Sequence, residues 1–266
     1  MRPLVSVVIP VYNSEKTIIP VLQSVIDQDY RPMEIILVDD GSTDNSKNLI
    51  NEFIESYPKE QIACTCISQE NQGVSVARNN GMKKAKGEYI ALLDSDDVWK
   101  ENKISLQIEA FQENKNIDLL ATNRNGEKFS SFFGVRFNKV TKISAKLLLY
   151  KNFLLTPTVL FKRKIIDEVG YFNETMSFSE DWEYFLRIAT KFECYLYNES
   201  LVITGFEKPA FGHSGLSKNI WQMEKGELYV ITQGFRMKTI SFLEYPVVIT
   251  YSLLKFVRRA VITIFR

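Results

Sequence analysis

Five aspartates follow two apolar stretches of the chain, and they could bind a cation together. Asp39-Asp40 comes directly after EIILV, and Asp94-Ser95-Asp96-Asp97 comes directly after YIALL. Carboxylates crowded in this way repel one another unless a cation or hydrogen-bond donors neutralise them. Asp94 and Asp96 offer the hard oxygen ligands that Mg²⁺ or Mn²⁺ prefers. We therefore expect a divalent-cation site there, completed by water and a substrate diphosphate.

A structural role is the alternative for part of this acidic segment. Asp94 or Asp97 could cap a helix that follows, because a carboxylate at a helix start accepts hydrogen bonds from backbone N–H groups. Asp97 suits this role better than Asp94 does, so it is only a possible metal ligand.

The elements that must position these carboxylates alternate between strand and helix over the first 120 residues. Nearly continuous apolar runs predict buried strands at Val5–Val11, Glu34–Val38, Ile62–Ile67, Tyr89–Leu93 and Ile117–Thr122. Apolar residues at helical spacing predict helices between them, over about residues 18–26, 49–54, 76–85 and 104–111. Apolar strands that alternate with helices form parallel sheets covered on both faces. The predicted fold class is therefore α/β, a doubly wound, mainly parallel sheet with helices on both faces.

Polar residues gather at one predicted edge of this sheet. Ligands of an open parallel sheet bind beyond the carboxyl ends of its strands. Pro10 and Tyr12 lie at the end of the first strand, and Glu15 follows as a possible further contact. The helix over residues 76–85 carries Arg78 toward the same edge, where a guanidinium can bridge phosphate and carboxylates. A solvated arginine on the helix face is the alternative interpretation.

Composition and missing motifs exclude several classes of protein. A formal net charge of +1 argues against nucleic acid as a partner. The sequence has neither GxGxxG after the first strand nor GxxxxGK[ST], so dinucleotide and P-loop binding lose their main support. Three cysteines form no disulfide framework, and the start does not resemble a signal peptide, so we expect a cytoplasmic protein with reduced thiols.

The alternation ends after about residue 123. Glu127–Phe137 predicts an irregular hairpin or flap, Thr158–Phe161 and Glu193–Ile203 predict strands, and Phe178–Phe192 predicts a helix. We expect residues 1–215 to form one domain, with a first half over about 1–122 and a second half over about 123–215.

The tail differs in composition from the rest of the chain. Residues 235–266 contain six basic residues and one acidic residue, and Tyr245–Leu254 carries no charge. This apolar stretch is too short to span a membrane, but it suits a helix in the interface of an anionic membrane. We therefore expect residues 216–266 to form a helical, membrane-associating extension. A helix packed on the core, with its basic residues in water, is the alternative.

Five motifs together resemble the family 2 glycosyltransferases. VSVVIPVYN, VDDGSTD, NQGVSVARNNG, LLDSDD and SED occur in that order between about residues 4 and 205. The resemblance implies the GT-A fold and transfer of a sugar from a nucleotide-sugar donor with inversion at the anomeric carbon. It also implies that Pro10, Tyr12, Asp39 and Asp40 surround the nucleobase and ribose.

The same resemblance implies roles at the acidic end of the site. Arg78, Asp94 and Ser95 would contact the donor, and Asp94 and Asp96 would form the family's DxD metal and diphosphate motif. Asp181 matches the family's catalytic base.

Asp181 suits that role physically. An inverting transfer needs one carboxylate to deprotonate the acceptor hydroxyl. Ser177 and Glu180 have the spacing of a capping box, which places Asp181 in the first turn of a helix. From the residues alone, a favourable interaction with the helix dipole is the preferred explanation of Asp181. Trp182 could form the floor of an acceptor site or pack in the core, and Glu180 is a further possible contact.

His213 is the sole histidine of the chain. Many relatives have a histidine after the base as a metal or phosphate contact, usually following a tyrosine–arginine pair, which is replaced here by Gly205–Pro209. His213 is therefore a possible contact only. Lys208, Gly212 and Gly215 suggest a loop that closes over the diphosphate.

We therefore expect a metal-dependent hexosyltransferase that uses a UDP-sugar and a glycan or lipid-linked acceptor, at the cytoplasmic face of the membrane. It would act in surface polysaccharide or glycolipid biosynthesis. A sugar nucleotidyltransferase is an alternative, but it would show a glycine- and arginine-rich, lysine-bearing loop after the first strand. A non-catalytic sugar-nucleotide-binding protein is another, against which the joint presence of Asp94, Asp96 and Asp181 argues.

Overall fold

The computed structural model describes residues 2–56, 62–205 and 218–264. Within them, nine strands form one sheet in the order β3-β2-β1-β4-β10-β6-β11-β5, with β9 paired to β11. The strands of this sheet are β1 Val5–Val11, β2 Met33–Asp40, β3 Ala63–Gln69, β4 Tyr89–Leu92, β5 Asp97–Trp99, β6 Leu119–Arg124, β9 Val140–Lys142, β10 Leu160–Lys162 and β11 Cys194–Thr204.

The sheet is mainly parallel, as predicted. β1 pairs in parallel with β2 and β4, β2 with β3, and β6 with β11, whereas β5, β9 and β10 run antiparallel to their neighbours. Pairing of Val11 with Asp39, and of Asp39 with Ser68, places the ends of β1, β2 and β3 at one edge. This edge is the one at which the sequence predicts a site.

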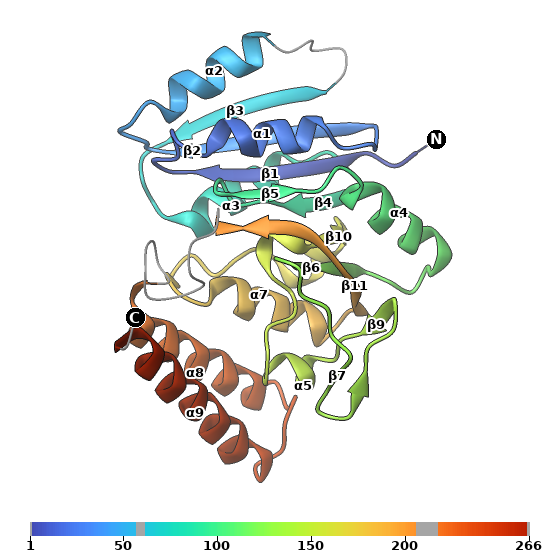
Figure 1. The fold of residues 1–266 in the computed structure, drawn as a ribbon, viewed down its shortest axis with the longest axis vertical. Coiled ribbons are helices and arrows are strands. Elements are labelled where there is room, and N and C mark those ends of the chain that lie inside the picture. Colours follow the sequence, from blue (N-terminus) through green and yellow to red (C-terminus); the bar gives the residue numbers. More distant parts are fainter. Residues whose placement is uncertain (1, 57–61, 206–217, 265–266) are drawn as a thin grey trace.

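Helices cover both faces of the sheet (Figure 1). On one face, the side chains of Val5, Val7, Ile9 and Val11 pack with helices α1, α2 and α4. On the other, Val8 packs in a core with α3, α6 and α7. The helices of these two layers are α1 Ile18–Ile26, α2 Ser46–Ser56, α3 Val74–Lys84, α4 Lys103–Glu113, α6 Ile165–Val169 and α7 Glu180–Ala189. The β-branched run of β1 is fully buried because both layers cover it.

The second half of the chain differs in detail from the sequence expectation. The predicted flap is a short hairpin of β7 Ser131–Phe132 and β8 Val135–Arg136. The predicted strand Thr158–Phe161 is a 3₁₀ turn, Thr156–Thr158, followed by β10. The strand β5 was not predicted, and its three residues pair with the end of β11.

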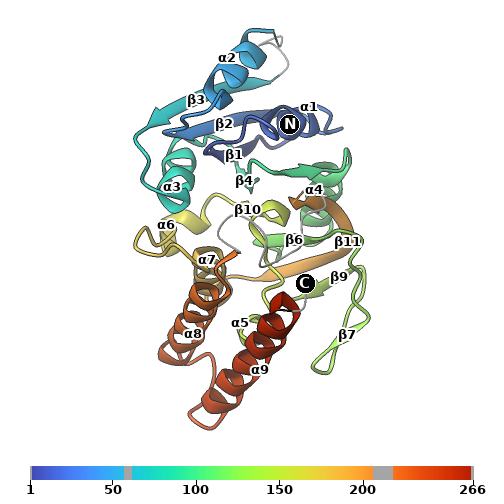
Figure 2. The same ribbon diagram turned by 60° about the vertical axis from the view of Figure 1, so that its left-hand side comes forward.

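Two long helices complete the described chain as an antiparallel hairpin, α8 Ile220–Arg236 and α9 Glu244–Ile264 (Figures 1 and 2). They pack beside α7 and the short helix α5, Ala145–Leu148, in a separate apolar cluster that includes Leu149, Trp182 and Val230. No helix of the described residues is long and apolar enough to cross a membrane.

Buried ion pairs join the two helices of the hairpin. Glu224 and Glu227 of α8 lie in the interior, where Arg259 of α9 pairs with both carboxylates. Lys255 donates to Glu227 at 3.3 Å, and Ser252 donates to Glu224 at 3.0 Å. Two of the six basic residues counted in the tail, Lys255 and Arg259, therefore turn inward, which corrects the part of the packed-helix alternative that placed all of them in water.

Candidate active site

The acidic segment leaves the sheet at the carboxyl end of β4, as predicted. Backbone and side-chain bonds tie it to the loop after β1, because the Ser14 and Ser95 hydroxyls lie 2.7 Å apart and Thr17 donates to the Ser95 carbonyl at 2.7 Å. The helix-cap alternative for Asp94 and Asp97 is wrong, since β5 follows and α4 begins only at Lys103, after Asn102. The segment is therefore held as a turn between two strands.

The carboxylates of this segment repel one another in the structure. Asp97 is buried, and one of its oxygens accepts from the Gly205 N–H at 2.9 Å. Burial, together with the charges of Asp94 and Asp96, raises the pKa of Asp97 to about 8. A divalent cation would relieve this repulsion, so the donor set fits the expected metal.

The described part of the chain offers few ligands for that cation. Among residues 2–56, 62–205 and 218–264, no group of three His, Cys, Asp or Glu side chains is placed to hold a metal. Asp94 and Asp96 would therefore supply two oxygens, and water and a diphosphate would supply the others, as Mg²⁺ commonly requires.

Arg78 of α3 links this segment to the opposite side of the site. It donates to Asp94 at 2.8 Å and to Glu180 at 2.9 Å, and the ring of Phe172 lies 5.3 Å from its guanidinium carbon. Arg78 is buried, so the interpretation as a solvated arginine is wrong. Burial alone would lower the pKa of Arg78, but the two carboxylates outweigh it and raise that pKa. The guanidinium is therefore a fixed positive charge between Asp94 and Glu180.

Asp181 lies beside this bridge in the first turn of α7. The carboxylate accepts from the Trp182 N–H at 2.7 Å and from the Asn152 amide at 3.4 Å. Burial and the neighbouring charge of Glu180 raise the pKa of Asp181 to about 7. A carboxylate with that pKa can accept a proton near neutral pH and release it again.

The predicted capping box in front of Asp181 is wrong. The helix begins at Glu180, and the residue before it, Ser179, has a left-handed backbone with φ +58° and no side-chain cap bond. Trp182 is core, because it is 5% exposed and its indole N–H donates to the Leu148 carbonyl at 2.9 Å. His213, Lys208, Gly212 and Gly215 lie outside the described residues.

The residues expected around the nucleotide lie at the carboxyl ends of β1 and β2. Tyr12 is 51% exposed at the end of β1, whose Pro10 is buried, and the Asp39 carboxylate accepts from the Ser42 N–H at 3.1 Å. Glu15 accepts from the Asn45 N–H at 3.2 Å, which ties the loops after β1 and β2 together.

Asp40 holds the turn that starts α3. Its carboxylate accepts from the N–H groups of Gln72 at 2.8 Å and Gly73 at 2.9 Å, and from the Gln69 amide at 2.8 Å. Gly73 has φ +93°, a conformation that favours glycine. Asp40 therefore orients the helix that carries Arg78.

Two residues of the site were not predicted. Ser14 joins the first loop to Ser95, and Asn152 reaches Asp181 from a position 29 residues earlier in the chain. Ser14 stands between Tyr12 and Glu15, which were singled out, so its position was a usable signal. Asn152 carries no local motif, because only the tertiary fold brings it to α7.

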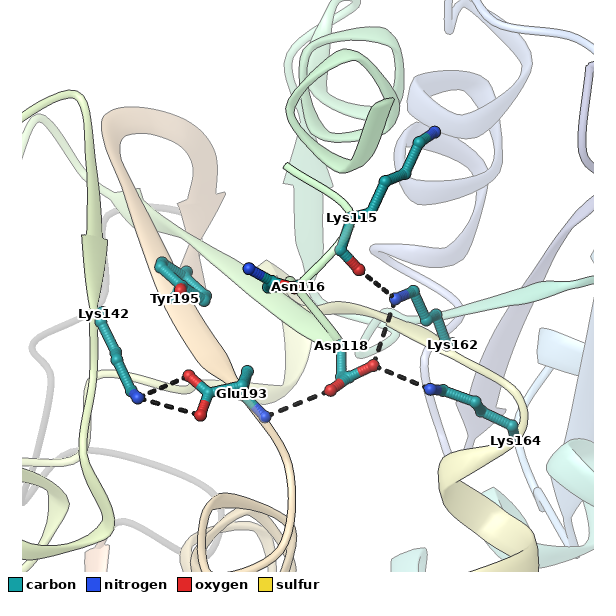
Figure 3. A pocket seen from close by; sticks show the side chains of 8 residues that line it. All are labelled: Lys115, Asn116, Asp118, Lys142, Lys162, Lys164, Glu193 and Tyr195. Carbon is teal, nitrogen blue, oxygen red and sulfur yellow. Dashed lines mark hydrogen bonds and ion pairs between the residues drawn. The ribbon is translucent and has the colours of Figure 1, made fainter. Parts of the chain in front are cut away.

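A separate pocket of about 560 Å³ lies at the opposite end of the strands (Figure 3). Its lining includes Asp118 and Glu193, which stand just before β6 and β11, and Lys162 at the end of the antiparallel β10. Asp118 pairs with Lys162 and Lys164, each at 3.1 Å. This pocket is therefore distinct from the site at the carboxyl ends of the strands.

Comparisons with known proteins agree with this arrangement. Over 192 residues, 71% of either chain, the protein is 35% identical to WfaP of Escherichia coli, a UDP-Glc:alpha-D-GlcNAc-diphosphoundecaprenol beta-1,3-glucosyltransferase. It is 41% identical over 124 residues to the glycosyltransferase GlyG of Streptococcus pneumoniae, a match that spans 46% of this chain and 40% of GlyG.

Fold comparison gives the same class. The mannosyltransferase PcManGT of Pyrobaculum calidifontis, solved with GDP-Man and Mn²⁺, matches with a TM-score of 0.72 at 17% identity, over 98% of this chain and 76% of that one. The model of glycosyl transferase family 2 matches residues 6–170. The chain therefore belongs to glycosyl transferase family 2 and has a GT-A-type fold.

Proposed function

We propose that this protein transfers a hexose from a UDP-sugar to a hydroxyl of a glycan or lipid-linked acceptor, with inversion at the anomeric carbon. The observation that carries the proposal is the bridge from Asp94 through Arg78 to Glu180, directly before Asp181. It joins a donor side, at the ends of the parallel strands, to a carboxylate whose pKa is raised to about 7. The lipid-linked acceptor and the UDP-sugar named for WfaP support the substrate classes.

The division of work follows from the charges. Tyr12 and Asp39 bind the nucleoside, and Arg78 holds the donor end of the site. Asp181 takes the proton of the acceptor hydroxyl as that oxygen bonds to the anomeric carbon. The bond from that carbon to the diphosphate oxygen breaks, and the nucleoside diphosphate leaves with the electron pair.

A divalent cation, Mn²⁺ or Mg²⁺, belongs to this site. Asp94 and Asp96 would hold it, and when bound it would neutralise charge on the departing diphosphate. The crowding of three carboxylates, Asp94, Asp96 and Asp97, on one short segment supports a cation here, and PcManGT, of similar fold, was solved with Mn²⁺.

The α8–α9 hairpin places the protein on an anionic membrane surface. Apolar side chains of the α8–α9 turn and of α9 face outward: Phe242, Leu243, Val247, Leu254, Val257 and Val261 are between 46% and 80% exposed. Arg236, Lys238 and Arg258 are exposed on the same hairpin. This combination of apolar and basic groups suits a membrane interface, where a lipid-linked acceptor is presented. The cytoplasmic face is the one on which nucleotide sugars are available.

The experiment is a transfer assay with the purified full-length chain. UDP-, GDP- and dTDP-sugars are each incubated with a bacterial lipid extract and Mn²⁺ or EDTA, and products are detected by mass spectrometry. The proposal expects a glycosylated lipid product with a UDP-sugar and none in EDTA. In a separate incubation with a sugar phosphate and a nucleoside triphosphate, release of pyrophosphate would instead identify a nucleotidyltransferase. Absence of turnover with every donor would overturn the proposal.

A further inference from the structure

The C-terminal hairpin packs tightly against the rest of the chain at Gly226 of α8. A Cβ atom added to Gly226 would lie 2.7 Å from the Ser179 hydroxyl, 2.8 Å from the Phe178 carbonyl oxygen and 3.0 Å from the Ser179 Cβ. Real Cβ atoms essentially never come under 3.0 Å. The Phe178 carbonyl and the Ser179 side chain therefore lie directly against α8, at a point where a Cβ atom would come too close to both.

The segment that α8 touches is the one that sets the direction of Asp181. Ser179 has φ +58°, an unusual conformation for a residue other than glycine, and α7 starts at the next residue. Conformations of this kind persist only where surrounding structure enforces them. Glu180 and Asp181 follow this residue at once, so a displaced Ser179 would displace both carboxylates.

The second helix of the hairpin reaches the other side of Asp181. Lys255 of α9 donates to the Tyr150 carbonyl at 3.3 Å, and its ammonium lies 5.4 Å from the centre of the Trp182 ring. Trp182 follows Asp181, and Tyr150 stands two residues before Asn152, the amide partner of Asp181. The ammonium is itself held by Glu227 at 3.3 Å, one residue after Gly226.

We propose that the α8–α9 hairpin is a positioning element for the catalytic base, with Gly226 and Lys255 as its two positioning residues. Gly226 holds the turn before Asp181 in place. Lys255 holds Trp182 and the segment of chain that contains Asn152. This proposal rests on the role of Asp181 in the proposed transfer. It assigns the hairpin a part in the chemistry besides any contact with a membrane.

The test compares two glycine substitutions in the same helix. Gly226→Ala brings a methyl group against the Phe178 carbonyl and the Ser179 side chain, whereas the atoms nearest to the new methyl group of Gly234→Ala belong to the flexible side chain of Leu149, the first at 2.7 Å. Both add one methyl group to the packed face of α8. We expect Gly226→Ala to lower kcat at least tenfold with the KM for the donor within twofold, and Gly234→Ala to keep kcat within twofold. The acid limb of the pH–rate profile should move only in Gly226→Ala.

A double variant separates positioning from general damage. Ser179→Gly removes the hydroxyl and Cβ that the new methyl group would meet, and glycine accepts φ +58° readily. Adding Ser179→Gly to Gly226→Ala should restore at least part of the lost kcat. Equal losses in Gly226→Ala and Gly234→Ala, or no recovery in the double variant, would overturn the inference.

Lys255→Met tests the proposal independently of Gly226. The substitution keeps the length of the side chain and removes its charge, and it should lower kcat at least fivefold while the KM for the donor is retained. If Gly226→Ala does not fold, an unchanged kcat in Lys255→Met overturns the proposal alone. Failure of the wild-type chain to transfer any sugar would instead count against the proposed function, so the two failures are distinguishable.

Discussion

Arg78 and Glu180 stand 102 residues apart in the sequence and form a buried ion pair at 2.9 Å. The pair joins α3, which packs on β1 and β2, to the first turn of α7. Asp94 binds the same guanidinium at 2.8 Å. One side chain therefore sets the relative position of the expected donor and acceptor sides.

Loss of this guanidinium should cost both stability and activity. Arg78→Ala leaves Glu180 and Asp94 without their shared partner, and breaking a buried ion pair typically costs about 3–5 kcal/mol. The free energy of unfolding, measured by denaturant titration, should fall by about that amount. Arg163→Ala removes an exposed arginine and serves as the control. A fall that is no larger in Arg78→Ala than in Arg163→Ala would contradict the role of the bridge.

The pH dependence of turnover should report Asp181. A base works only in its ionised form, and the pKa of Asp181 is raised to about 7. The value of kcat/KM should therefore rise with pH and level off above about 7, and below that value it should fall about tenfold per pH unit. A profile that is flat from pH 5 to pH 8 would contradict the assignment.

The raised pKa of Asp181 also predicts how the stability of the fold changes with pH. The carboxyl titrates at 3.8 when unperturbed and at about 7 in the folded chain, so the folded state holds the proton over that interval. Asp181 therefore destabilises the fold increasingly as pH rises from about 4 to 7. Asp181→Asn should raise Tm at pH 8 and leave Tm nearly unchanged at pH 4, as measured by calorimetry. Equal changes at both pH values would show that Asp181 is not perturbed.

Cation binding can be followed without turnover. Ligands that bind only the folded state raise Tm, so Mn²⁺ with UDP should raise the Tm of the wild-type chain. Asp96→Asn should reduce that increase, whereas Asp167→Asn, an exposed aspartate of α6, should keep it. An increase in Tm that Asp96→Asn leaves intact would place the cation elsewhere.

Membrane attachment should depend on apolar contact more than on charge. Lys255 and Arg259 are engaged by Glu224 and Glu227, which leaves Arg236, Lys238 and Arg258 exposed on the hairpin. Replacing Phe242 and Leu243 together by serine should lower the fraction of protein that sediments with phosphatidylglycerol vesicles. Sedimentation with neutral vesicles, and with phosphatidylglycerol vesicles at added salt, measures the smaller electrostatic contribution to membrane binding. Unchanged sedimentation of the double variant would show that this face does not contact the membrane.

Strand positions were predictable from sequence where both faces of the strand are buried. Val5–Val11 is such a strand, and its predicted bounds are those of β1. β5 escaped prediction because it has three residues and forms only by pairing with β11, about one hundred positions later. The antiparallel direction of β10 likewise depends on where its neighbours lie, which no local pattern encodes.

Side-chain positions were likewise predictable only where a local motif contains the residue. The acidic segment and Asp181 could be singled out because motifs carry them. The left-handed backbone of Ser179 could not, since Ser177 and Glu180 have the spacing of a capping box, and the close approach of Gly226 comes from a helix more than 40 residues later in the chain. The inward pairing of Lys255 and Arg259 also depends on the packing of α8 against α9.

The central claim is that Asp181 takes the proton during sugar transfer at this site. The most direct measurement is the rate of product formation at pH 8 by Asp181→Asn beside Asp167→Asn, with binding of UDP measured by calorimetry in both. We predict a loss of at least about 100-fold in Asp181→Asn, UDP affinity within twofold of wild type, and a normal rate in Asp167→Asn. Transfer by Asp181→Asn at the wild-type rate would contradict the claim.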